Sequence, residues 1–213
     1  MKIYTKLILL ILCFPILLFA KTQQYKLDVA HSSVSFSIKH LKTITVLGDF
    51  KEITGNILFD KKKPKKSFFE GGVMAASVNT KNKKRDNHLR SADFFDVENY
   101  PGIHFKTKKI KKKRGQLVLI GDFTIKDVTK SVKIPITILG PKKDDWGMSH
   151  IGLKGQFEID RSDYNLKWNK YLDSGDIVLG NKVQIDLKIE AETTIPGLKT
   201  RRRPRGYFFK KKR

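Results

Sequence analysis

Cysteine is almost absent from this sequence, which contains only Cys13, within its first twenty residues. The rest of the chain therefore has no thiol for a disulfide, a metal thiolate or a nucleophile. The sequence also lacks an HExxH zinc motif, a glycine-rich phosphate loop and a Gly-x-Ser-x-Gly nucleophile elbow. These absences leave little for metal chemistry or covalent catalysis. We expect a protein without a cofactor, which its buried core alone holds together.

Long apolar runs are also scarce, and the longest one extends from Leu7 to Phe19. Lys2 and Lys6 precede it, and the small residue Ala20 follows it. This order is typical of a secretory signal peptide over residues 1–20, cleaved after Ala20, and it predicts a periplasmic protein. A membrane anchor is the alternative, but the run is short for a span that needs roughly 20 residues.

Acidic residues are few: the chain has 21 Asp and Glu against 44 Lys and Arg, a net charge of +23. Residues 199–213 contain nine Lys or Arg and no acid. We expect this segment to be a disordered basic tail. It would either contact an anionic membrane peripherally or have no role. Export argues against nucleic acid as a partner, and Lys61–Lys66 and Lys111–Gly115 are interpreted as turns with solvated charge.

Apolar residues alternate with polar ones through most of residues 21–198, which we take as one domain. The alternation is clearest where Val34, Phe36 and Ile38 are separated by serines. Each such segment predicts an antiparallel strand with one buried face. About eight segments show the pattern strongly or weakly: 33–39, 46–60, 67–78, 103–109, 117–125, 131–138, 151–159 and 182–190. Strands at this spacing favour a β-sandwich or a β-barrel.

Two polar stretches, 80–95 and 162–173, interrupt the alternation and predict loops with one or two short helical segments. In a closed sheet of eight strands, the interior is narrow and holds side chains or one small ligand. A thin apolar chain would fit such a space, and its polar headgroup would remain at the mouth, where polar groups are satisfied at low cost.

Charged residues cluster in the first of these loops, at Arg85, Asp86, His88 and Arg90. Arginine and histidine suit a phosphate-like headgroup. The structural alternative is that Arg85 or Arg161 pairs with Asp86 and locks the loop. His31, close behind Asp28, is interpreted as part of a hydrogen-bonded turn. An acid/base pair of His31 or His88 with Asp28 or Asp86, in a hydrolase or isomerase, is the less favoured reading.

Several blocks, in one order along the chain, resemble the YceI-like family. They are Tyr25–Leu41, Gly48–Phe50 with Gly55–Ile57, Arg85–Leu89, Asp93–Val97, Tyr100–Phe105, Gly121–Val132 and Ile159–Tyr164. The resemblance implies an all-β fold, an eight-stranded antiparallel lipocalin-like barrel in the cell envelope. It also implies an apolar pore that binds a polyisoprenoid or a similar amphiphilic lipid. The basic tail has no counterpart in the family pattern.

We therefore predict a protein that binds, stores or transports a polyisoprenoid or isoprenoid quinone without covalent catalysis. A fatty acid or fatty amide is the alternative ligand. The sequence is also compatible with a homodimer. The predicted cavity residues are apolar and mostly aromatic: Phe36, Ile38, Phe50, Phe94, Phe95, Phe105, Phe123, Phe157 and Trp168. Phe94, Phe95 and Trp168 are expected at the mouth, and Arg85, Asp86 and His88 are the predicted headgroup residues.

Overall fold

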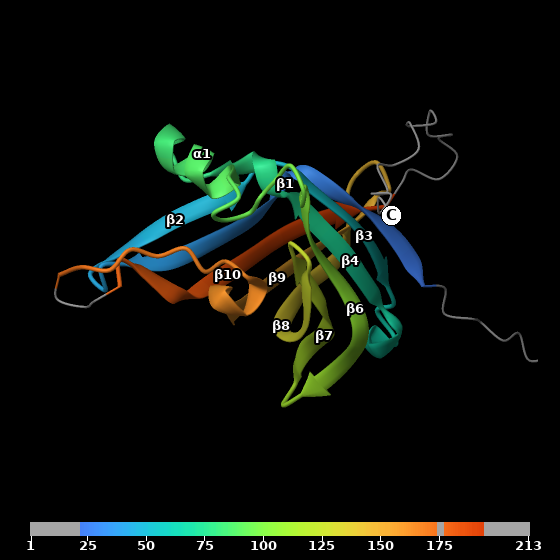
Figure 1. Ribbon diagram of the computed structural model, residues 1–213. Helices are drawn as coiled ribbons and strands as arrows, with labels where there is room; N and C mark the ends of the chain where they lie inside the picture. Colours follow the sequence, from blue (N-terminus) through green and yellow to red (C-terminus); the bar gives the residue numbers. More distant parts are fainter. Residues whose placement is uncertain (1–21, 174–176, 194–213) are drawn as a thin grey trace, which may run out of the picture.

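β-Strands account for most of residues 22–173 and 177–193, which are the part of the chain described by the computed structural model (Figure 1). The strands are β1 (Gln23–His40), β2 (Ile44–Phe50), β3 (Ile53–Phe59), β4 (Phe68–Met74), β5 (Val78–Asn79), β6 (Gly102–Lys113), β7 (Gln116–Ile125), β8 (Val128–Lys143), β9 (Ser149–Asp160) and β10 (Leu179–Glu192). The short helices are α1 (Lys83–Arg90) and the 3-10 turns η1 (Pro64–Lys66), η2 (Ala75–Ser77) and η3 (Arg161–Tyr164).

Antiparallel pairing closes the sheet into a barrel. The strand order is β10-β9-β8-β7-β6-β4-β3-β1-β2-β5, and β10 also pairs with β1. The first half of β1 pairs with β3, from Gln23 opposite Phe59, and its second half pairs with β2, as far as His40 opposite Ile44. The strands β2 and β3 therefore share one position, interrupted at residues 51–52, and eight positions complete the ring. This confirms the predicted eight-stranded antiparallel barrel.

Successive connections alternate between the two ends of the barrel, because every pair of neighbouring strands is antiparallel. We call one end the mouth end. Its connections are residues 41–43, 75–101, 126–127 and 161–178, which include α1 and η3. The other, the far end, carries connections 60–67, 114–115 and 144–148, the start of β1 and the end of β10.

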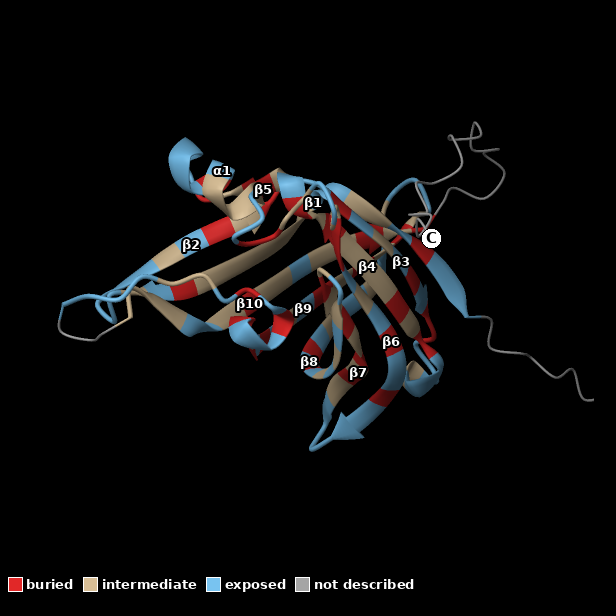
Figure 2. Cartoon of the chain, viewed as in Figure 1, coloured by how far each residue is buried: buried red, intermediate tan, exposed pale blue. Residues whose placement is uncertain are grey.

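Inward-facing side chains follow the predicted alternation and form one apolar core. On β8, Ile134 and Ile136 are buried, whereas Lys133, Pro135 and Thr137 between and beside them are exposed (Figure 2). Pro135 precedes the first residue of β8 that pairs with β9, Ile136. Pro135 thus lies where β8 has only β7 as its partner, which suits a residue that has no backbone N–H to donate.

The predicted loops at 80–95 and 162–173 contain one α-helix, α1, and the end of η3. No helix of the described residues is long and apolar enough to cross a membrane. The signal peptide predicted at residues 1–20 and the tail at 199–213 lie outside the described residues, so both stay predictions.

Candidate functional site

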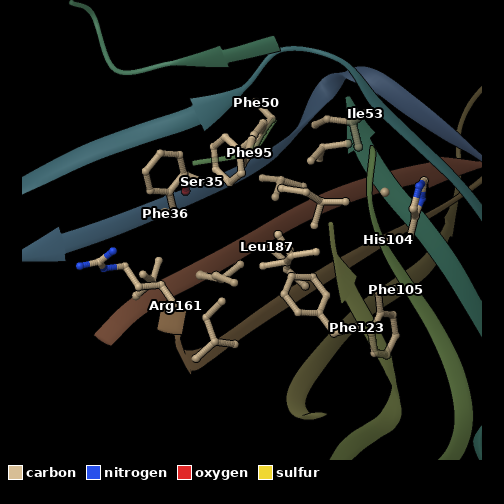
Figure 3. A pocket seen from close by; sticks show the side chains of 18 of the residues that line it. Ser35, Phe36, Phe50, Ile53, Phe95, His104, Phe105, Phe123, Arg161 and Leu187 are labelled. Atoms are coloured by element: carbon tan, nitrogen blue, oxygen red, sulfur yellow. The ribbon is translucent and has the colours of Figure 1, made fainter. Parts of the chain in front are cut away.

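A cavity of about 630 Å³ occupies the interior of the barrel and reaches α1 at the mouth end. Strands on all sides of the ring contribute to its wall, which is mainly aliphatic and aromatic (Figure 3). The volume falls within the range of roughly 300–1,000 Å³ that is common for small-molecule sites. An apolar space of this size suits an apolar ligand that displaces little bound water.

All nine residues predicted to line a cavity lie on the wall of this one. Alternation brings six of them there from strands that are far apart in the sequence, because residues two apart in a strand share a face. The other three, Phe94, Phe95 and Trp168, lie in connections of the mouth end. They are Phe36 and Ile38 on β1, Phe50 on β2, Phe94 and Phe95 after α1, Phe105 on β6, Phe123 on β7, Phe157 on β9 and Trp168 after η3. Whether each contacts a ligand stays a prediction.

Two aromatic groups shape the interior. The ring of Phe50 lies 5.6 Å from that of Phe36 and 5.8 Å from that of Phe95, between ring centroids. Gly48, opposite Phe36, allows this arrangement, because a Cβ atom there would overlap the Phe36 ring. On the other side, the Phe123 ring meets Phe157 edge-on, with centroids 5.4 Å apart.

Tyr164 completes the second group, with its ring centroid 5.8 Å from that of Phe123. It is almost fully buried, and burial, assisted by the nearby Asp163 carboxylate, raises the pKa of Tyr164 to about 12. The phenol therefore stays neutral through the physiological range and does not add charge to the interior.

A third aromatic group, the mouth cluster, joins α1 to the segment after η3. It consists of His88, Phe94 and Trp168, whose ring centroids lie 4.9 to 5.3 Å apart. The Nε2 atom of His88 is 2.8 Å from a carboxylate oxygen of Asp93. The structure thus brings together one predicted headgroup residue and two of the three predicted mouth residues. Phe95 instead packs on Phe50, inside the barrel.

The helix α1 supplies the cationic side of the mouth. Asn82 caps the helix, since its side-chain oxygen accepts a hydrogen bond from the backbone N–H of Arg85 at 3.0 Å. Lys84, Arg85 and His88 from this helix all line the cavity. Lys84 was not among the predicted site residues, although its place beside Arg85 in a loop over the mouth was a usable signal.

Thr80 connects Arg85 and Asp86, which the sequence suggested as a direct ion pair. Asp86 is buried and accepts hydrogen bonds from the Thr80 backbone N–H at 2.8 Å and from its hydroxyl at 2.6 Å. The Arg85 guanidinium donates to the same hydroxyl oxygen and to the Thr80 carbonyl. Asp86 is not on the cavity wall, so its position favours the structural role over the predicted headgroup role.

Arg161 is a cavity-wall residue that the sequence did not predict as part of the site, since it was considered there only as a partner for Asp86. Its side chain lines the cavity and is 3% exposed. The guanidinium donates hydrogen bonds to four backbone carbonyls, those of Leu166, Trp168, Leu179 and Gly180. Burial lowers the pKa of Arg161 from its usual value. This one side chain ties the segment that carries Trp168 to the start of β10.

His31 and Asp28, considered from the sequence as an acid/base pair, lie outside the cavity. In the unpaired bulge of β1 between Asp28 and Ser33, the Nδ1 atom of His31 is 2.7 Å from an Asp28 carboxylate oxygen. Asp28 also accepts the backbone N–H groups of Ala30 and His31, as the turn interpretation expected. The His31 side chain is 68% exposed. Glu190 lies close to both side chains, and none of the three lines the cavity inside the barrel.

Known proteins of one family are similar to this chain in sequence. The family model described as the YceI-like domain matches residues 25–191. Protein YceI of Escherichia coli O157:H7 is 35% identical over 150 residues, which are 70% of this chain and 78% of that protein.

Solved structures give the same result. The Campylobacter jejuni YceI protein superposes with a TM-score of 0.62 at 32% identity, over 80% of this chain and 98% of that one. A polyisoprenoid binding domain from Saccharophagus degradans has the same fold, with a TM-score of 0.59 at 14% identity, over 80% and 98% of the two chains. Sequence blocks, closed barrel and family match agree: the chain belongs to the YceI-like family.

Proposed function

We propose that this protein binds a long-chain amphiphilic lipid of the polyisoprenoid or isoprenoid quinone type, with the chain inside the barrel and the headgroup at the mouth. The observation that carries the proposal is the apolar cavity of about 630 Å³, with Lys84, Arg85 and His88 of α1 on its wall at the mouth end. Each buried methylene of a ligand contributes about 0.8 kcal/mol by transfer from water. An extended hydrocarbon therefore binds tightly without specific polar contacts along its length.

The mouth supports the placement of the headgroup. Lys84 and Arg85 bring positive charge to the cavity wall, and His88 adds a ring nitrogen 2.8 Å from Asp93. Such groups favour an anionic or hydrogen-bond-accepting headgroup, for example a phosphate or a quinone carbonyl. Because the Arg85 guanidinium is already held by Thr80, its position is fixed before a ligand arrives.

Family membership supports the same function. The Saccharophagus degradans domain of this fold is described as polyisoprenoid binding. Of the two acid/base pairs considered from the sequence, His31 with Asp28 lies on the outer surface, and His88 pairs with Asp93 rather than with Asp86. We therefore propose binding, storage or transport without covalent catalysis and without a cofactor.

Mass spectrometry of the protein isolated from its native envelope tests this function directly. We expect native spectra to show a bound species, and extracted lipid to give masses related by whole isoprene units. If the extracted masses instead belong to a series of fatty acids or fatty amides, the ligand is the alternative one and not an isoprenoid. A protein that shows only its bare mass in every gentle preparation contradicts lipid binding.

Matched variants locate the ligand. Phe123→Trp fills part of the cavity, and losing room for about two methylenes should weaken lipid retention about tenfold. Thr124→Asp is the control, since Thr124 is the next residue of the same strand and bonds to Thr129 on the outer face. Cooperative thermal unfolding of both variants would verify the fold. Equal retention by both variants would place the lipid elsewhere.

We also propose a periplasmic location, supported by the leader-like residues 1–20. Peripheral membrane contact through the basic residues 199–213 and a homodimer are further proposals that the sequence allows. Amino-terminal sequencing of the mature protein tests export, with a new terminus expected at Lys21.

A further inference from the structure

The two lysine-rich segments of the barrel domain meet at the far end. Lys61–Lys66 lies in the β3–β4 connection and contains η1. Lys111–Arg114 covers the last three residues of β6 and the first residue of the β6–β7 turn. The turn η1 packs against β6, so the two segments are neighbours in space although some fifty residues separate them in the sequence. We call their basic side chains the far-end patch. Its members are Lys61, Lys62, Lys63, Lys65, Lys66, Lys111, Lys112, Lys113 and Arg114.

All nine side chains of the far-end patch are exposed (Figure 2). Within the described part of the chain, none of them forms an ion pair, whereas Lys51, Lys108, Lys130 and Lys182 do. The nearest acid in sequence, Asp60, is buried and accepts the backbone N–H groups of Lys62 and Lys63 at 2.9 and 2.8 Å. The patch is thus a concentration of positive charge without neutralisation.

A third connection at the far end displays an aromatic ring. Trp146, in the β8–β9 connection, is 76% exposed, and Lys142 and Lys143 precede it, followed by Asp144 and the exposed Asp145. Asp144 fixes this connection by accepting the backbone N–H groups of Trp146 at 3.0 Å and of Met148 at 2.8 Å. Tryptophan has an apolar body and a polar N–H group, and such residues gather where membrane meets water.

We propose that the far end is a docking surface for an anionic phospholipid bilayer, so that the mouth faces away from the bilayer to which the protein is bound. Clusters of four to eight basic residues are sufficient to attract anionic lipid surfaces, at about fivefold in affinity for each residue near the surface. The far-end patch has nine.

The composition of the patch favours a lipid surface over nucleic acid. Its two segments, Lys61–Lys66 and Lys111–Arg114, contain no aromatic residue on which a base could stack, and eight of the nine cations are lysines. Lysine acts as a point charge that attracts phosphate without fixing its geometry. The proposal does not depend on a lipid inside the cavity, because the far-end patch and the mouth lie at opposite ends of the barrel.

Vesicle sedimentation with the mature protein tests the surface. Wild-type protein should bind phosphatidylcholine vesicles that contain phosphatidylglycerol, should not bind phosphatidylcholine alone, and should release as salt rises to physiological strength. The variant K62Q/K65Q/K111Q/K113Q should bind at least about fifty-fold more weakly. The control K81Q/K83Q/K167Q/K170Q removes the same charge from exposed lysines of the mouth end. It should change binding less than about threefold.

The two tryptophans of the chain report the orientation, since Trp146 is at the far end and Trp168 at the mouth. Brominated lipid should quench Trp146 in the W168F variant and leave Trp168 unquenched in W146F. Equal weakening by both lysine quadruple variants would overturn the proposal. So would selective quenching of Trp168, or tighter binding to short duplex DNA than to anionic vesicles at the same salt concentration. Lipid retention in the cavity is a separate measurement, so none of these outcomes bears on the proposed lipid binding.

Discussion

The mouth end and the far end use positive charge in opposite ways. At the mouth, Arg85, Arg90 and Arg161 each make at least two hydrogen bonds to nearby residues, most of them to backbone carbonyls. At the far end, eight lysines and one arginine extend into solvent. Arginine presents several donors in a rigid plane, whereas lysine is a flexible, strongly hydrated charge. The mouth end also exposes lysines such as Lys81 and Lys83, but its arginines hold the backbone in place, whereas the cations of the far-end patch all face solvent.

Each end also depends on one buried carboxylate. Asp86 organises the start of α1 through Thr80, and Asp60 organises the β3–β4 connection through the backbone of Lys62 and Lys63. Both side chains are almost fully buried, at 6% and 4% exposure. The two ends thus share a method of fixing a loop and differ in what the fixed loop presents: a cavity rim at one end and a charged surface at the other.

Replacing Arg161 should have the largest effect on this contrast. In Arg161→Lys the charge is kept, but one ammonium group cannot reach the four carbonyls that the guanidinium binds. Leaving buried carbonyls without donors should lower the free energy of unfolding by about 3 kcal/mol. Urea unfolding measures the loss.

Lys62→Arg at the far end is the matched control, and it should change the free energy of unfolding by less than about 0.5 kcal/mol. If Arg161→Lys were as stable as wild type, charge rather than fork geometry would hold the mouth, and the distinction between the two ends would fail.

Removing either buried carboxylate, Asp86 or Asp60, should reduce stability less than Arg161→Lys does. Only the loss of Asp86 should also affect lipid binding. Asp86→Ala and Asp60→Ala each leave former donors unpaired and should each cost about 2 kcal/mol. Because Asp86 lies beneath the mouth, its loss should also speed the release of bound lipid, whereas Asp60→Ala should not. Native mass spectrometry measures the lipid occupancy of each variant, and urea unfolding of the same samples measures its stability. Comparing the two measurements separates an effect on lipid release from an effect on stability. Equal lipid loss in both variants would show that general destabilisation empties the cavity.

The smallest expected effect is a pH dependence at the far end. The hydrogen bond that the His150 ring donates to the Asp144 carboxylate raises the pKa of His150 above 6.5, with Glu190 and Glu192 adding to the shift. Since the folded pKa is raised, the stabilisation is complete below the unfolded value of about 6.5 and is lost as pH rises through the folded value. Titration by NMR should show this pKa, and Asp144→Asn should lower it. An unchanged pKa in that variant would assign the shift to the glutamates.

Alternation along the strands predicts most of the fold, because a period of two fixes which residues face inward. Six of the nine predicted cavity residues lie in alternating strands, whereas Phe94, Phe95 and Trp168 come from the two polar stretches, and all nine share one wall. Alternation does not specify partners. The division of one barrel position between β2 and β3 at residues 51–52, and the bulge at residues 29–32, depend on pairing with distant strands and leave no local signal.

The polar part of the site was less predictable for a similar reason. Arg85 and Asp86 are neighbours in sequence, which suggested an ion pair, but Thr80 supplies the oxygen and the donors between them. Arg161 follows β9 directly, and its four acceptors belong to segments that only the folded barrel brings near. Likewise, no local signal relates the two lysine-rich segments, which the packing of η1 on β6 brings together. The second was predicted as a turn, but Lys111, Lys112 and Lys113 belong to β6, and only Arg114 and Gly115 form the turn.

Because β1 pairs with β10, the ring of strands is closed, and the chain could begin at another strand without changing the barrel. Lys26 lies opposite Glu192, so the beginning and the end of the described chain are neighbours. A short linker between them, with new termini opened at the exposed turn of Arg114 and Gly115, would give a circularly permuted protein with the same ring of strands. Such a permutant would carry a fused reporter on the β6–β7 turn, clear of the mouth.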